Sequence, residues 1–206
     1  MSERQFLEPE AKRRTADAIR AVEAQTCVEV VVAVRRAASL HVLSSVLFGV
    51  AAGIAGFAIM WLSPREYDVR TMPLDAALAG VLGAALVASV PSLRRALTPR
   101  GARRRAAERA AQQAFASLGI EKTRERTGVL VFVALFERTV VLLPDRGIPE
   151  TLGRGALASL EELLSTAVER RDLAAFLSAL AKLGPACGAV LPRRADDENE
   201  LCDDVA

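Results

Sequence analysis

Residues 40–62 read LHVLSSVLFGVAAGIAGFAIMWL, a run of 23 residues without a formal charge when the histidine is neutral. A helix of about 20 apolar residues is long enough to cross the ~30 Å hydrocarbon core of a bilayer. A short polar turn follows, and residues 76–93 form a second stretch of 18 uncharged residues. The two stretches predict a transmembrane helical hairpin, with spans at about residues 40–62 and 74–93.

The rest of the chain has the composition of a well-solvated domain. Residues 40–93 hold five of the 52 charged residues, so the other 152 residues carry 47 charges, about 31%. A domain of that size could hardly enclose two apolar helices, which disfavours a hairpin buried in a soluble core. We therefore interpret residues 1–39 and 94–206 as one discontinuous soluble domain, interrupted by a transmembrane hairpin at residues 40–93.

The segments outside the hairpin alternate between helices and strands. Pro9 suits the first turn of an amphipathic helix, and the apolar run at residues 27–34 is typical of a strand covered on both faces. Residues 128–136 and 139–143 predict two further strands, joined by a tight polar break. This order predicts an α/β fold, a three-layer α/β/α sandwich with a mixed sheet. The remaining helices are expected at residues 98–118, where Thr98 is placed as the N-cap, and at residues 152–169 and 172–183.

Arginine flanks the two apolar stretches unevenly. Two arginines, Arg65 and Arg70, lie in the polar turn, whereas eight lie on the domain side. Those eight are Arg35, Arg36, Arg94, Arg95, Arg100, Arg103, Arg104 and Arg105. The positive-inside rule then predicts that the soluble domain lies in the cytoplasm.

The arginine cluster has two possible partners, anionic lipid and nucleic acid. Aromatic residues make up 4% of the chain and do not alternate with the arginines, so the stacking platform of a nucleic-acid site is missing. Arginines beside a membrane span are attracted to anionic lipid, which favours the bilayer as the partner. The three cysteines cannot all pair, which suits a reducing compartment.

Four stretches together resemble the TPM domain family, named for a thylakoid acid phosphatase, a photosystem repair protein and a modulator of acetylcholine receptors. They are residues 23–32 (EAQTCVEVVV), 126–133 (RTGVLVFV), 137–148 (ERTVVLLPDRGI) and 199–203 (NELCD). The chain is similar to the bacterial membrane-anchored branch, in which a two-span hairpin interrupts the domain, and this likeness implies a location at the bacterial inner membrane. The resemblance implies an α/β/α sandwich, divalent-metal binding in some members, and phosphatase activity in a minority. Cys202 stands where the family motif has proline.

A candidate metal site centres on Asp145. This residue follows the third predicted strand, in a loop that contains Gly147. A carboxylate and loop carbonyls are oxygen ligands, which suit Ca²⁺ or Mg²⁺. Glu29 and Asp203, with the neighbouring Glu200 and Asp204, complete the predicted site if the acidic tail, residues 193–206, folds back. The alternative is that Asp145 only caps its own turn.

Two functions remain open at this point. The first is a membrane protein whose cytoplasmic TPM-like domain is a binding or accessory module for other membrane or cytoplasmic proteins. The alternative is a membrane-anchored, metal-assisted phosphatase that hydrolyses phosphomonoesters. A two-metal phosphatase normally shows several clustered aspartates and histidines, and this chain has one histidine, His41, at the start of the first span. The pattern therefore favours the binding module and leaves the oligomeric state open.

Overall fold

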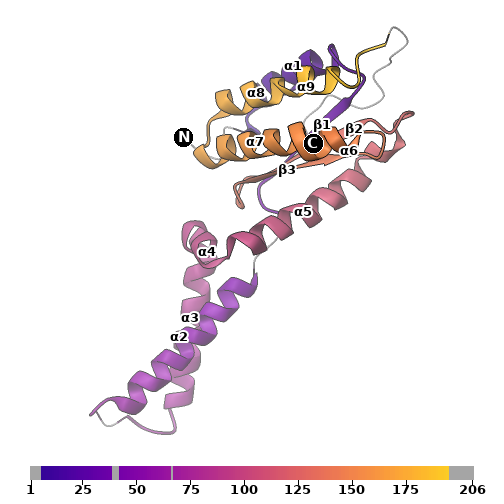
Figure 1. Cartoon of the computed structure of the whole chain (residues 1–206). Helices are drawn as coiled ribbons and strands as arrows, with labels where there is room; N and C mark the ends of the chain where they lie inside the picture. The colour runs from indigo at the N-terminus through magenta and orange to yellow at the C-terminus, as the bar shows by residue number, and fades with distance from the viewer. Residues whose placement is uncertain (1–5, 39–41, 66, 195–206) are drawn as a thin grey trace. The chain divides into compact units, whose positions relative to one another are not determined.

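The computed structural model describes residues 6–38, 42–65 and 67–194. It is a mixed α/β structure that divides into two compact units (Figure 1). One unit is formed by Met1–Ser39 together with Arg103–Ala206, and the other by Leu40–Ala102. The chain therefore leaves the first unit once, forms the second, and returns.

The first unit is built on a three-stranded sheet in the order β1 (Glu29–Arg35), β2 (Gly128–Ala134), β3 (Thr139–Pro144). β1 and β2 are parallel, and β2 and β3 are antiparallel. A tight turn at residues 135–138 joins β2 to β3, whereas parallel strands need a long crossover. That crossover contains the apolar segment. The predicted mixed sheet, with its last two strands paired as a hairpin, is confirmed.

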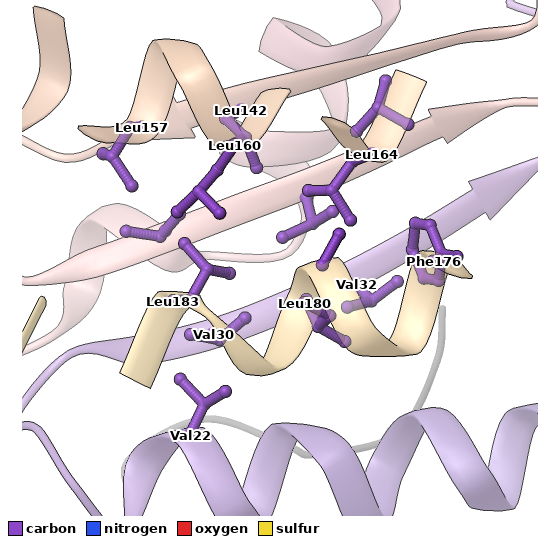
Figure 2. Packing of buried hydrophobic residues seen from close by; sticks show 14 of the residues in the cluster. Val22, Val30, Val32, Leu142, Leu157, Leu160, Leu164, Phe176, Leu180 and Leu183 are labelled. Carbon is purple, nitrogen blue, oxygen red and sulfur yellow. The ribbon is translucent and has the colours of Figure 1, made fainter. Parts of the chain in front are cut away.

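One face of the sheet carries the larger apolar core (Figure 2). Val30 and Val32 of β1 and Leu142 of β3 belong to it. Valines of β2 join them, and four helices cover this face: α1 (Pro9–Glu23), α7 (Ala158–Arg170), α8 (Leu173–Ala181) and α9 (Leu183–Gly188). Their buried residues include Val22, Leu160, Leu164, Phe176, Leu180 and Leu183.

The opposite face of the sheet packs against α5 (Arg100–Ser117). Val31 and Ala33, which alternate with the valines of the first face, share a buried cluster with alanines of this helix. These are Ala107, Ala111 and Ala114, which lie on one side of α5 and permit a close approach. Because β1 is buried on both faces, its sequence is a continuous apolar run instead of an alternating one.

The second unit is a hairpin of two apolar helices, α2 (Val42–Leu62) and α3 (Met72–Ser89), followed by the short α4 (Pro91–Leu97). By length and composition, both long helices could cross a membrane. They pack closely at small residues. A Cβ atom placed on Gly49 would lie 2.7 Å from the Gly80 carbonyl oxygen, and one on Gly53 would lie 3.0 Å from that of Ala76. The small residues therefore serve contacts within the hairpin.

The structure differs from the predicted helices at several points. The second apolar helix ends at Ser89 instead of residue 93, because Val90 precedes a proline and is extended (φ −110°, ψ 98°). The prediction that Thr98 caps the next helix is wrong. Its hydroxyl donates to the Arg94 carbonyl at 2.8 Å, and α5 begins at Arg100. The short helix α9 was not predicted, since its sequence, LGPACG, holds two glycines and a proline.

Candidate functional site

Glu29 and Asp145 lie in one row across the sheet, with Gly128 between them. Glu29 pairs with Gly128 in the β1–β2 register, and the Asp145 N–H donates to the Gly128 carbonyl at 2.8 Å. Counting alternate residues along β1 and β3 places both carboxylates on the face that packs against α5. The sheet thus brings two of the three predicted metal ligands to the same end and the same face, although they lie on its two opposite edge strands. Asp203 lies outside the described residues.

Asp145 is a buried carboxylate with two different oxygens. The residue is 6% exposed, although it lies in a loop. Its Oδ1 accepts the Arg146 N–H at 2.7 Å, which is the turn-capping role considered above. Its Oδ2 is buried and accepts no hydrogen bond within the described part of the chain. Turn capping therefore accounts for one oxygen of the carboxylate and does not account for the other.

Gly147 holds the Asp145 loop against the segment before β2. Its N–H donates to the Arg126 carbonyl at 2.8 Å. A Cβ atom at this position would lie 2.3 Å from the Glu125 carbonyl oxygen and 2.6 Å from that of Arg126. Arg126 itself has a positive φ of 58°, which a non-glycine residue adopts only when its surroundings enforce it. Two backbone carbonyls thus lie directly against the loop that carries the buried carboxylate.

Glu29 does not meet Asp145 directly. The residue is 7% exposed, and its Cα lies two strand spacings, about 10 Å, from that of Asp145. A methyl group of Ile120 occupies the space above Gly128, 2.4 Å from where a Cβ would be. Among the described residues there is no group of three His, Cys, Asp or Glu side chains that could hold a metal ion. A complete cation site would therefore need oxygen ligands besides these two carboxylates.

The last described residues of the chain lie at this same end of the sheet, just before β1. The Leu191 carbonyl accepts the Thr26 hydroxyl at 2.6 Å and the Cys27 N–H at 3.2 Å. Pro192 forms an isolated bridge with Thr26, and the Arg194 guanidinium pairs with the Glu125 carboxylate. The described part of the chain therefore ends beside Glu125, whose carbonyl lies against Gly147.

Glu137 has a role that the sequence did not reveal. Residues 137 and 138 were interpreted as a polar break, yet Glu137 is 2% exposed. Its carboxylate accepts the Ala38 N–H at 3.0 and 3.1 Å, and its carbonyl accepts Arg103 Nη1 at 3.4 Å. Ala38 precedes the inserted segment and Arg103 follows it. Glu137 therefore fastens both junctions of the insertion to the β2–β3 turn.

Charged side chains also occupy the outer edges of the sheet. Glu161 of α7 accepts the Leu142 N–H of β3 at 2.9 Å through Oε2, and its Oε1 accepts Arg104 Nη2 at 2.7 Å. The hydrogen bond from Arg104 to Glu161 is the main cause that raises the pKa of this arginine. At the other edge, Glu23 accepts the Val30 N–H of β1 at 2.9 Å. Arg104, predicted as part of a lipid-facing cluster, thus serves a contact inside the domain.

Comparisons with known proteins relate this architecture to one solved structure. No family model matches the chain, and no curated protein sequence matches it. The chain is similar to the NMR structure of the BA42 protein from the psychrophilic bacterium Bizionia argentinensis, with a TM-score of 0.58 and 17% sequence identity. The match covers 98% of this chain and 94% of that one. At that identity, the likeness extends to the fold alone.

Proposed function

We propose that this chain is an integral membrane protein in which the α2–α3 hairpin anchors a cytoplasmic domain that acts as a binding or accessory module. One observation carries the membrane assignment. The outward faces of the hairpin are apolar and exposed, with Ile59 and Trp61 67% exposed and Leu62 80% exposed. A contiguous apolar surface of this kind is typical of contact with lipid or with another protein. The length of both helices favours lipid.

The cytoplasmic orientation is supported by the charge beside the spans. Eight arginines lie on the domain side and two in the polar turn, which favours retention of the domain side in the cytoplasm of a bacterial cell. The test is labelling of intact cells with a membrane-impermeant maleimide, in a chain whose three native cysteines are replaced by alanine. Tyr67→Cys in the polar turn is expected to react, and Arg105→Cys on the exposed side of α5 is expected to react only after lysis. The reverse pattern would overturn the orientation.

The domain itself is proposed to be TPM-like, with the α/β/α sandwich that the resemblance implies. A mixed sheet that has helical contacts on both faces supports this proposal. The leading role is a binding module, because the described residues hold no group of three His, Cys, Asp or Glu side chains of the kind that a two-metal phosphatase uses. Its partners are then the bilayer and other membrane or cytoplasmic proteins.

A divalent cation, Ca²⁺ or Mg²⁺, is proposed to bind at Asp145. The buried Oδ2 and the carbonyls of Glu125 and Arg126 beside the loop are the hard oxygen ligands that such ions prefer. Glu29, on the same face, and Asp203 are the carboxylates proposed to complete the site. When bound, the ion supplies positive charge that would neutralise these carboxylates.

The cation site is tested by thermal unfolding of the detergent-solubilised chain with and without Ca²⁺ or Mg²⁺. A ligand at 100 times its Kd stabilises the folded state by about 2.7 kcal/mol. Asp145→Asn keeps the Oδ1 acceptor for the Arg146 N–H and removes the charge, so it is expected to abolish the rise in Tm. Glu162→Gln, at an exposed position on α7, is the matched control and should leave the rise unchanged. An equal rise in both variants would exclude Asp145 from the site.

The same protein preparations distinguish the alternative function. Hydrolysis of p-nitrophenyl phosphate that requires Mg²⁺ or Ca²⁺ and is lost in Asp145→Asn would favour the metal-assisted phosphatase. Cation-dependent stabilisation without turnover would favour the binding module.

A further inference from the structure

We propose that the acidic segment, residues 195–206, binds to an arginine pair formed by Arg126 and Arg146, which lie on two loops joined by the Gly147 hydrogen bond. The occupant of this surface is thus a part of the same chain. The proposal goes beyond the proposed function, because it does not depend on whether a cation binds at Asp145. It rests on the charge of the segment, the placement of the two arginines and the point from which the segment departs.

Half of the residues in the acidic segment are charged, and all of these charges are negative. Its twelve residues, ADDENELCDDVA, contain six carboxylates and no Lys, Arg or His. The carboxylates belong to Asp196, Asp197, Glu198, Glu200, Asp203 and Asp204. Such a run repels itself and needs a basic surface if it is to be held against a folded domain.

Arg126 and Arg146 are adjacent basic residues on two different loops. The Gly147 N–H donates to the Arg126 carbonyl at 2.8 Å, so the backbones of the two loops touch one residue away from Arg146. Both arginines are exposed, and neither guanidinium has a hydrogen-bond or ion-pair partner in the described part of the chain. The main-chain contacts hold the two loops together and leave the charged ends of both side chains to a partner.

Arg194, the residue directly before the acidic segment, lies beside this arginine pair. Arg194 pairs with Glu125, the residue directly before Arg126. This ion pair uses the charge of Arg194 and neutralises Glu125, which is the acidic residue next to the pair in sequence. A segment of twelve residues reaches up to about 40 Å when extended, so the arginine pair lies well within its range. Tethering of this kind gives the segment an effective concentration of millimolar order at the pair.

The proposal is tested with a fluorescent synthetic peptide of residues 195–206. It is added to the detergent-solubilised chain, either intact or truncated after Arg194, and binding is followed by fluorescence anisotropy. The truncated chain is expected to bind the peptide at least about tenfold more tightly than the intact chain, because the tethered segment competes for the same surface. Raised salt is expected to weaken binding, as for any contact between exposed charges. A peptide with Asn and Gln in place of Asp and Glu should not bind.

Variants of the arginine pair test whether the peptide binds at Arg126 and Arg146. In the truncated chain, Arg126→Gln with Arg146→Gln is expected to weaken peptide binding about tenfold, since each exposed pair contributes modestly. Arg13→Gln with Arg14→Gln on α1 is the matched control, which removes the same charge from another exposed surface and should change little. Melting curves establish that both double variants are folded.

Three results would overturn the proposal. The first is an equal loss of binding in the two double variants, which would indicate a non-specific charge effect. The second is no binding of the peptide to the truncated chain. The third is equally tight binding to the intact and truncated chains, which would indicate that the surface serves a separate acidic partner and not this segment.

Discussion

Glu137 offers the most direct test of how the inserted segment is attached. Replacement by alanine removes the acceptor of the Ala38 N–H at a residue that is 2% exposed. Leaving a buried donor without a partner costs about 1–3 kcal/mol, and the cavity left by the side chain adds to that cost. We therefore expect Glu137→Ala to destabilise the domain by about 3 kcal/mol. For a domain of this size, 1 kcal/mol shifts Tm by about 2–4 °C, so the expected decrease is about 6–12 °C.

Two further variants make this prediction specific. Glu137→Gln keeps a carbonyl acceptor for the Ala38 N–H and loses the charge, so we expect roughly half of the effect. Glu162→Ala, at an exposed position of α7, is the control and should melt like the unmodified protein. Scanning calorimetry in detergent is the suitable assay, because Trp61 lies in the hairpin and its fluorescence would not report on the domain. If Glu137→Ala melted within about 2 °C of the control, the hydrogen bond to Ala38 would not fasten the junction.

Three other outcomes follow from local geometry. Gly147→Ala places a Cβ atom 2.3 Å from the Glu125 carbonyl oxygen, so a decrease in Tm larger than that of an exposed Gly→Ala change is expected by calorimetry. Burial raises the pKa of Cys187 to about 11, and the neighbouring Cys27 thiol adds a smaller effect. Alkylation of Cys187 at pH 9 should therefore be slow, which peptide mass spectrometry can measure. The folded state binds the Cys187 proton more tightly than the unfolded chain does. The contribution of this thiol to the free energy of unfolding is therefore complete below the ordinary thiol pKa and is lost as the pH rises to about 11. Gly80→Val meets the Gly49 carbonyl at 3.0 Å and should separate the hairpin helices, which loss of a cross-link between introduced cysteines on α2 and α3 would reveal.

Local patterns in the sequence were sufficient to predict most of the secondary structure. The continuous apolar run of β1 predicted a strand buried on both faces, and the structure contains it between α5 and the helices of the larger core. The two uncharged stretches predicted the long helices of the hairpin, although Pro91 ends the second one earlier. Each of these signals lies within about 20 neighbouring residues, where hydrophobicity and proline act directly.

The candidate site depended on contacts that no local pattern encodes. Asp145 and Glu29 were predicted as ligands, but only the sheet register shows that they share a face and that Ile120 occupies the space between them. Glu137 looked like an ordinary turn residue, because its partner Ala38 is 99 positions away in the sequence. The one available signal was an acidic residue in an otherwise apolar strand–turn–strand stretch.

The side chains that cap the outer edges of the sheet have a further consequence if the hairpin anchors the domain in a bilayer, as proposed. A protein confined to a surface meets its own copies often, and an open strand edge would offer them a template for pairing. Here Glu161 takes the Leu142 N–H, Ser165 exchanges hydrogen bonds with Val140, and Glu23 takes the Val30 N–H. A neighbouring chain would have to displace buried or ion-paired carboxylates before it could add a strand. On the proposed membrane, crowding would therefore leave loops and helix surfaces as the parts of this domain open to contact with another chain.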